Sequence, residues 1–381
     1  MKVYLDNAAT TRPDPEVIES MMPYLTGHFG NPSSVHSFGR DTRSAIELAR
    51  KKIAQLIGAA PTEIYFTSCG TEADNTALSG FVETYSITHV ITTRIEHHAV
   101  LHTLDHLKKT KGINIIFLKT DASGAFGMQE LEGTLADHPR ALVTLMHANN
   151  EIGNLTDIEK VAELCLEYQA YFHSDTVQTL GKIPLNVGRL KLNSLAGSAH
   201  KFHGPKGIGF LYVNKSSKIG PYLHGGGQER NLRSGTENVA GIVGMSKALE
   251  IAINNLEKNR QYIMGLKSHM IHRLNAAIPG IGYNGLSGDL ENSLATILNI
   301  SLPSTAENEM LLFQLDLGQV AVSGGSACSS GAQAGSHVLD ALGSDPHRQA
   351  IRFSFSKYNT KEEVDYAVDK LAELLAEGKT V

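Results

Sequence analysis

Strand-like runs alternate with helical runs from about residue 41 to residue 213, and this alternation limits the possible folds more than any other feature. It is typical of a sheet with helices wound on both faces. The connection at 198–206 has no helical period and is too short for a parallel crossover, so the strand after it is predicted to run antiparallel. We count seven strand-like runs, at residues 64–67, 90–94, 113–118, 141–146, 170–174, 193–197 and 207–213.

Amphipathic helices are expected to join most of these strands. Residues 159–168, for example, place four apolar side chains on one face at helical spacing: Val161, Ala162, Cys165 and Leu166.

The C-terminal part of the sequence predicts a smaller α+β domain. A long helical pattern runs from Ile242 to about Ala277 and leads away from the sheet, and strand-like runs follow at 295–300 and 351–355. We expect a large domain at residues 14–255, a small domain made of residues 1–13 and 256–381, and the long helix as the joint between them.

The last helix of the chain has clear boundary signals. Thr360 and Glu363 have the spacing of a capping box, and Gly378 ends the pattern. The buried stripe is expected to contain Val364, Ala367, Val368, Leu371 and Leu375.

Composition excludes several classes of function. A chain of 381 residues with 41% hydrophobic content can bury one large core and a smaller one. The net charge of −5 provides no basic face for nucleic acid or an anionic membrane, and no run is long enough to span a bilayer. Three cysteines cannot pair evenly and no targeting segment precedes Tyr4, so we expect a reducing cytoplasm.

A lysine among glycines is the strongest candidate for a catalytic group. Lys201 lies in GSAHKFHGPKGIG (197–209), directly after an apolar strand. A lysine amine with a lowered pKa forms Schiff bases, most often with pyridoxal phosphate, whose ring nitrogen needs a carboxylate partner. Asp175 ends the preceding strand, where α/β sheets meet their ligands, and Gln178 follows it. The alternative is that Asp175 caps a turn and Lys201 is a surface lysine.

Other strand ends supply further groups for such a cofactor. FTSCGTEADNTAL (66–78) gives strand, turn and helix, so Gly70 and Thr71 could hold a phosphate. His97 in IEHHAVLHT could stack on the ring, and Asn150 in MHANNEIGN could bond to the ring hydroxyl. The alternatives are structural: a glycine turn, a polar residue that begins a helix (His97 or His98), and an asparagine that caps a turn.

The three cysteines lie in different surroundings. Cys328 lies in SGGSACSSGAQAGS (323–336), which has only small or polar side chains, so we expect a mobile segment whose cysteine is a candidate nucleophile. Cys165 lies on a helical stripe and is expected to be structural. Cys69 lies beside the proposed phosphate turn and is expected to be a packing residue.

The sequence resembles the cysteine desulfurases of the NifS and IscS type, which are pyridoxal phosphate enzymes of fold type I with a seven-stranded, mostly parallel sheet and a smaller α+β domain. The segment around Cys328 resembles this branch more than the SufS branch. The matching stretches span nearly the whole chain: YLDNAATT (4–11), GNPSSVHSFG (30–39), SCGTEADN (68–75), EHHAVL (96–101), NNEIG (149–153), HSDTVQTLGK (173–182), SAHKFHGPKGIG (198–209), GGGQERNLRSGTENV (225–239) and SGGSACSSG (323–331).

The resemblance implies a role for each matching residue. Lys201 would be the Schiff-base lysine, Asp175 the partner of the ring nitrogen and His97 the stacking ring. Arg352 would bind the substrate carboxylate with its two-pronged guanidinium. The remaining contacts to the cofactor would come from Gln178 and Asn150 at the ring hydroxyl and from Gly70, Thr71, Ser198, His200 and the partner subunit's Thr236 at the phosphate.

The resemblance also implies a reaction and partners. L-cysteine would lose its sulfur to Cys328, giving L-alanine and a persulfide, with His97 or Lys201 moving protons. The partners would be a second copy of the chain and a sulfur-acceptor protein of iron–sulfur cluster or thio-cofactor biosynthesis. An iron–sulfur scaffold is the first candidate, beside a transfer-RNA thiolation enzyme or a nitrogenase-dedicated partner, with Cys328 as a possible transient cluster ligand and no resident metal. The competing interpretations are another fold-type I enzyme (a selenocysteine lyase or an aminotransferase) and a non-catalytic sulfur-assembly protein. Cys69, Ser174, Thr176 and Ser356 depart from the usual pattern, but none of them removes a catalytic group.

Overall fold

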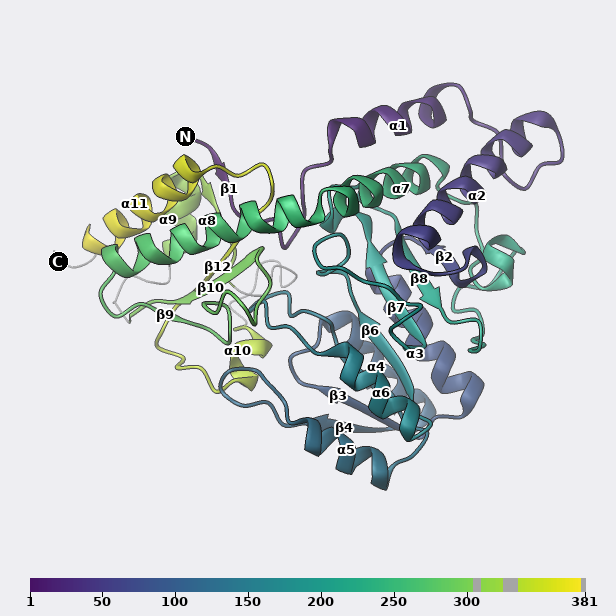
Figure 1. Ribbon diagram of the computed structural model, residues 1–381, viewed down its shortest axis with the longest axis horizontal. Coiled ribbons are helices and arrows are strands. Elements are labelled where there is room, and N and C mark those ends of the chain that lie inside the picture. Colours follow the sequence, from purple (N-terminus) through teal and green to yellow (C-terminus); the bar gives the residue numbers. More distant parts are fainter. Residues whose placement is uncertain (304–309, 325–334, 378–381) are drawn as a thin grey trace.

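The computed structural model describes residues 1–303, 310–324 and 335–377. Its centre is a seven-stranded sheet with the order β2-β8-β7-β6-β5-β3-β4 (Figure 1). The strands from β7 to β4 are parallel, whereas β8 is antiparallel to both of its neighbours, which confirms the sequence prediction. The strands are β2 (Ile64–Thr67), β3 (His89–Thr93), β4 (Asn114–Leu118), β5 (Leu142–Thr144), β6 (Tyr171–Asp175), β7 (Ser194–Ser198) and β8 (Gly209–Val213).

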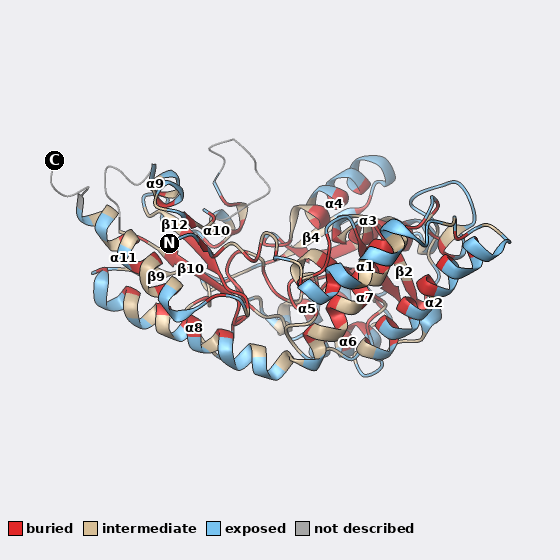
Figure 2. Cartoon of the chain, turned by 90° about the horizontal axis from the view of Figure 1, so that it is seen from above, coloured by how far each residue is buried: buried red, intermediate tan, exposed pale blue. Residues whose placement is uncertain are grey.

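Helices cover both faces of this sheet because each helix has one apolar side. On one face, α3 (Gly70–Tyr85) and α4 (His98–Lys111) share a hydrophobic cluster with β8 and β3. On the other face, a larger cluster joins the sheet to α2 (Ser37–Ile57), α5 (Met128–Asp137), α6 (Ile158–Glu167) and α7 (Val239–Asn254). Figure 2 shows the buried residues gathered on the inner sides of these helices. The α1 helix (Pro15–Thr26) packs on α7. Short 3-10 helices in the described part of the chain include η1 (Pro61–Glu63), η2 (Ala199–Lys201) and η3 (Gln228–Asn231).

One side chain of α6 lies outside the buried stripe that the sequence predicts. Val161, Ala162 and Cys165 are buried as predicted, but Leu166 is 56% exposed. Leu166 follows Cys165 directly and is therefore turned by about 100° around the helix axis, which carries it out of the buried stripe.

A second core supports the smaller part of the molecule. Its sheet has the order β12-β10-β9, and all pairs in it are antiparallel. The short strands β1 and β11 pair in parallel beside it. The elements of this part are β1 (Val3–Tyr4), α8 (Leu256–Ala277), β9 (Gly282–Tyr283), β10 (Ile297–Ser301), α9 (Leu311–Leu317), β11 (Val320–Ala321), α10 (His337–Ala341), β12 (Ala350–Ser354) and α11 (Lys361–Glu377).

The α11 helix begins as predicted. The Thr360 backbone N–H donates to Glu363 Oε2 at 3.1 Å, and the Glu363 N–H donates to Thr360 Oγ1 at 3.2 Å, which completes the capping box. The predicted end at Gly378 lies outside the described residues. The stripe is fully buried at Val364, Ala367, Val368 and Leu371, and Leu375 is partly buried.

The long helical pattern at the joint forms two helices. The α7 helix ends at Asn254 and α8 begins at Leu256, because Asn255 between them has φ −112° and ψ 14°. The two helices follow one another from the large sheet to the smaller core in Figure 1. We propose the boundary between the domains at 255/256, where the residues of the first core give way to those of the second. Within the described residues, none of the helices has the length and apolar character that crossing a membrane requires.

Candidate active site

A cavity of about 240 Å³ lies at the carboxyl ends of the parallel strands, where sheets of this type bind ligands. It brings together residues from six of the segments that the sequence analysis singled out, at 66–78, 95–103, 146–154, 173–182, 197–209 and 351–355. The predicted residues that line it are Gly70, Thr71, His97, Asn150, Asp175, Gln178, Ser198, His200, Lys201 and Arg352.

Lys201 ends the short helix η2, directly after β7. Its Nζ donates hydrogen bonds to the carbonyl oxygens of Ala8 at 2.6 Å and Ala9 at 2.9 Å. The amine therefore lies inside the cavity and is oriented by backbone at the other end of the sequence.

Asp175 is the last residue of β6 and is 7% exposed. Its Oδ1 accepts a hydrogen bond from the Val177 N–H at 2.9 Å. Burial raises the pKa of Asp175 to about 6, although the Val177 bond and the charge of Lys201 act in the opposite direction. A cationic nitrogen placed beside this carboxylate would favour its ionised form, because opposite charges at short range stabilise each other.

A buried acid and histidine lie behind Asp175. His173 Nε2 lies 3.1 Å from Asp74 Oδ1, and both side chains are almost fully buried. Burial lowers the pKa of His173 to about 3. Burial, followed by the charge of Asp175, raises the pKa of Asp74. The neutral forms are therefore favoured, and Asp74 itself lines the cavity.

The first turn of α3 forms the end of the cavity that suits an anion. Gly70 begins this helix, and a Cβ at this position would lie 2.6 Å from Val177 Cγ2, so the close approach requires glycine. Ser198 Oγ is buried without a hydrogen-bond partner, and Thr71 lies on the same turn as Gly70. His200 Nδ1 lies 3.2 Å from Thr10 Oγ1. A helix N-terminus and an unsatisfied buried hydroxyl together fit a phosphate group.

His97 has a structural role and also lies at the cavity. It is the N-cap of α4, and its Nδ1 accepts a hydrogen bond from the Ala99 N–H at 3.1 Å. Its ring also lines the cavity. Burial, followed by the charge of Lys201, lowers the pKa of His97 to about 4, so the ring is neutral near pH 7 and carries its hydrogen on Nε2.

Arg352 brings the smaller domain into the site from β12 and is 1% exposed. Its Nη1 donates to the Asn150 carbonyl oxygen at 2.8 Å, and its Nη2 donates to Asp6 Oδ1 at 2.9 Å. Its Nε has no hydrogen-bond partner, so the guanidinium retains a donor for a ligand. Gln178 is fixed from two sides, since its Nε2 donates to the Ala8 carbonyl at 3.1 Å and its Oε1 accepts from Lys182 Nζ at 3.2 Å.

One predicted residue does not line this cavity, and another lies outside the described residues. Thr236 is exposed and lines a different hollow with Phe66 and Arg233, so within one chain it does not reach the phosphate end. Cys328 lies outside the described residues. Cys165 is 2% exposed, as expected for a structural cysteine, and burial raises the pKa of its thiol well above the usual range. Cys69, expected to be a packing residue, is half-buried and lines the cavity.

The structure adds residues that sequence reasoning missed. Burial raises the pKa of Glu96 to about 8, so this side chain is a neutral acid at pH 7, and its Oε1 accepts from the Met146 N–H at 2.9 Å. His337 lines the cavity from α10, and its Nε2 lies 2.9 Å from the Glu96 carbonyl oxygen. Glu151 accepts a hydrogen bond from the Ser336 hydroxyl. In the sequence, the position of Glu96 directly before His97 could have pointed to this residue. Nothing in the sequence pointed to His337 or Ser336.

Comparison with known proteins identifies relatives of the whole chain. The family model described as aminotransferase class-V matches residues 3–367. The chain is 45% identical to a protein named cysteine desulfurase IscS from Dictyoglomus turgidum, over 100% of this chain and 96% of that protein. It is 43% identical to a putative cysteine desulfurase IscS 1 from Bacillus subtilis, over 98% of each. A solved structure named NifS-like protein superimposes with a TM-score of 0.91 at 40% identity, over 99% of this chain and 100% of that one.

Proposed function

The chain belongs to the aminotransferase class-V family, and we propose that its cavity holds pyridoxal 5′-phosphate between Lys201 and Asp175 for the removal of sulfur from L-cysteine. The chain is a cysteine desulfurase: its curated relatives of that name are 41–45% identical to it over essentially their whole length. The observation that carries the proposal for the site is that Lys201, Asp175 and Arg352, from both domains, line one cavity.

The residues present fit the cofactor. Asp175 would pair with the ring nitrogen, since burial alone leaves this carboxylate poorly stabilised. Lys201 would hold the aldehyde carbon, and His97 would cover one face of the ring. When bound, pyridoxal phosphate provides a sink for the electrons released at the substrate Cα. The phosphate would lie against Gly70, Thr71, Ser198 and His200, and the ring hydroxyl against Gln178 and Asn150.

The side chains divide the work on the substrate. Arg352 would bind the cysteine carboxylate through Nε and the second N–H of a terminal nitrogen, beside its bonds to Asp6 and Asn150. The Lys201 amine would take the proton from the substrate Cα. Neutral His97 carries a hydrogen on Nε2 that it could donate. His97 is therefore in the neutral form that its proposed role needs near pH 7.

Cys328 would accept the sulfur. As a thiolate it attacks the sulfur atom of the substrate, the carbon–sulfur bond breaks, and its electron pair returns to the substrate carbon skeleton. A persulfide on Cys328 and, after protonation, L-alanine result. The segment around Cys328 contains only small or polar side chains, which suits transfer of the sulfur to a second protein.

A homodimer would complete the site. Thr236 is exposed and lies away from the cavity of its own chain, so it is available to the phosphate of a partner subunit. The helices α1 and α2 and the segment between them also expose a patch of large apolar side chains, which is typical of an interface: Ile18, Met22, Leu25, Phe29, Val35 and Phe38. Figure 2 shows the exposed outer sides of these helices.

The persulfide would pass to an acceptor protein in the cytoplasm. We propose an iron–sulfur scaffold, with Cys328 as a transient ligand of the growing cluster. The names of the relatives support a cysteine substrate and sulfur transfer.

One experiment tests the proposal for the site. Purified enzyme is incubated with L-cysteine, alanine is quantified, and the persulfide is trapped and located by mass, beside Lys201→Ala and Cys328→Ala. We expect no alanine from Lys201→Ala and no protein-bound persulfide from Cys328→Ala. An aminotransferase would instead produce a keto acid and ignore the loss of Cys328, and a selenocysteine lyase would prefer selenocysteine. A native rate of persulfide loading in Cys328→Ala would refute the role of that thiol.

A further inference from the structure

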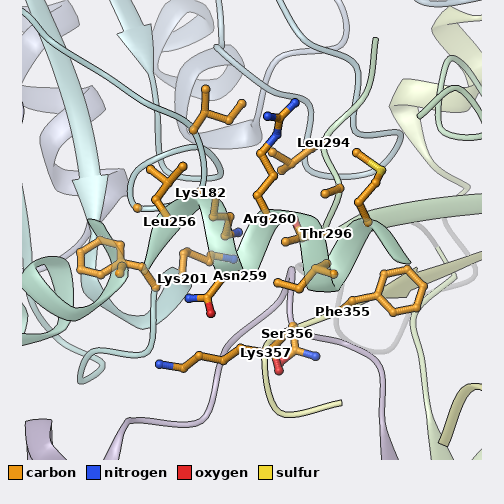
Figure 3. Close-up of a pocket in the computed structure, with 18 of the residues that line it drawn as sticks. Lys182, Lys201, Leu256, Asn259, Arg260, Leu294, Thr296, Phe355, Ser356 and Lys357 are labelled. Carbon is orange, nitrogen blue, oxygen red and sulfur yellow. The ribbon is translucent and has the colours of Figure 1, made fainter. Parts of the chain in front are cut away.

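A second cavity, of about 250 Å³, lies at the joint between the two domains. Its walls come from the turn at 181–184, the end of α7, the first turns of α8, the segment before β10 and the residues that follow β12 (Figure 3). None of the roles proposed above uses this space.

The second cavity lies back to back with the active-site cavity. Lys201 lines both. Gln178 lines the active-site cavity, and its Oε1 accepts a hydrogen bond from Lys182, which lines the second cavity. The wall between the two spaces is therefore formed in part by Lys201 and the Gln178–Lys182 hydrogen bond. In Figure 3 the amine ends of Lys182 and Lys201 point toward each other.

The lining is mainly apolar but carries a net positive charge. Four basic side chains (Lys182, Lys201, Arg260 and Lys357) line it together with one acid, Glu291. Lys357 is already paired with Asp14 at 2.6 Å, and Arg260 with Glu257 at 3.7 Å. The charge available to a ligand therefore lies mainly on the side of Lys182 and Lys201. The apolar part of the wall includes Leu155, Ile183, Leu256, Ile263, Leu294 and Phe355.

Two polar groups mark the place for the polar end of a ligand. Thr296 is 6% exposed, and its Oγ1 has no hydrogen-bond partner although the side chain lines the cavity. A buried hydroxyl without a partner is unfavourable, and a bound acceptor or donor would satisfy it. Burial, followed by the charges of Lys201 and Arg352, lowers the pKa of Lys182 to about 7. An anion beside Lys182 would favour the charged amine.

We propose that the second cavity is a binding site for a small monocarboxylate with an apolar body of about six carbons, whose carboxylate contacts Lys182 Nζ and the Thr296 hydroxyl. The size follows from the volume, because an apolar cavity of about 150 Å³ holds a molecule of the size of benzene and this one is larger. The charge follows from the excess of basic side chains. The binding site does not depend on the proposed desulfurase chemistry, so binding is measured without cysteine and independently of alanine formation.

The test is calorimetric titration of the purified enzyme, as isolated, with hexanoate, 1-hexanol and hexylamine. We expect saturable binding of one hexanoate per chain, at least about tenfold tighter than 1-hexanol, because a hydrogen bond to a charged group is worth about one to two orders of magnitude in affinity. Hexylamine should give no saturable heat. Lys182→Met should reduce hexanoate binding to the level of 1-hexanol, and Thr296→Val should weaken it several-fold.

Two controls make the outcome decisive. Thr144→Val removes another fully buried hydroxyl without a partner, on β5 and outside the cavity, and should leave hexanoate binding unchanged. Arg352→Lys keeps the positive charge that acts on Lys182 and alters a residue that lines the active-site cavity but not the second cavity, so it should also leave hexanoate binding unchanged. Thermal melts establish that each variant is folded, and Thr296→Val carries the test should Lys182→Met fail to fold. The proposal is overturned if the native enzyme shows no saturable binding, if binding is unchanged in Thr296→Val and in any folded Lys182→Met, or if Arg352→Lys abolishes it.

Discussion

Replacement of Asp175 by asparagine should raise the Tm of the enzyme without its cofactor. In the cofactor-bound enzyme, the same replacement should lower the Tm relative to the native protein. Burial raises the pKa of this carboxyl from 3.8 to about 6, so the folded protein favours the protonated form. Below pH 3.8 the folded and unfolded states are both protonated and there is no penalty. As the pH rises through 6, the folded state must hold a buried charge, and the penalty reaches about 3 kcal/mol. Asparagine has no charge and keeps an oxygen for the Val177 N–H.

The expected effect is large enough for thermal melts. Unfolding entropy of about 2.1 cal/mol/K per residue over 381 residues gives about 0.8 kcal/mol/K, so 3 kcal/mol raises Tm by about 4 °C. Apo Asp175→Asn should therefore melt about 4 °C above the apo native protein at pH 8, and about half of that difference should remain at pH 5. With pyridoxal phosphate added, the order should reverse, because the native carboxylate gains a cationic partner. Alanine formation by the variant should fall by at least about 100-fold.

Melts of the apo and cofactor-bound proteins test the buried-charge argument and the pairing with the cofactor separately. A variant that melts below the native protein in the apo form at pH 8 would refute the buried-charge argument. An equal rise of Tm on addition of pyridoxal phosphate to both proteins would refute the pairing of Asp175 with the cofactor, even if the apo prediction held.

Three further variants test other parts of the structure. Glu229 forms a buried pair with Arg50 at 2.7 Å, so Glu229→Gln should lower Tm by about 4–6 °C in thermal melts. The control Glu83→Gln breaks an exposed pair with Lys111 at 2.8 Å and should change Tm by about 1 °C or less. Arg352→Lys should raise the KM for cysteine by about 10- to 100-fold in steady-state kinetics, since lysine cannot form the two-pronged bond, and an unchanged KM would exclude that role. Because the pKa of His97 is lowered to about 4, His97→Phe should reduce kcat without changing the shape of the pH–rate profile between pH 6 and 8; a lost limb in that range would contradict this.

Much of the fold could be predicted because it depends on local pattern. The strand-like runs matched the seven strands of the main sheet with ends that differ by at most two residues, and the irregular connection at 198–206 correctly predicted the antiparallel β8. Thr360 and Glu363 marked the start of α11 by chemistry alone. The break at Asn255 was missed, because asparagine inside an apolar helical pattern does not by itself end a helix.

Much of the candidate site could also be predicted, because α/β sheets gather the residues at their strand ends. Asp175 ends β6, and Lys201 follows β7 closely enough to face the same cavity. The residues that were missed depend on tertiary packing. His337 reaches the cavity from α10 in the smaller domain, and its position depends on how the two domains meet. Lys182 and Thr296 are likewise brought to one cavity only by tertiary packing, which the sequence pattern does not reveal.

The N-terminal segment shows why motif and mechanism are hard to connect from sequence. The run YLDNAATT begins in the small-domain strand β1, and its Asp6 pairs with Arg352. The next contacts are made by backbone: the carbonyl oxygens of Ala8 and Ala9 accept the hydrogen bonds of the Lys201 amine. Thr11 then fixes the segment to the large domain, with its N–H and its hydroxyl both donating to the His200 carbonyl oxygen. One short segment, with a turn at residues 7–9, thus contacts both the arginine proposed to bind the substrate and the amine that would take the Cα proton. The alanine side chains carry no chemistry, so what the motif must preserve is the path of its backbone.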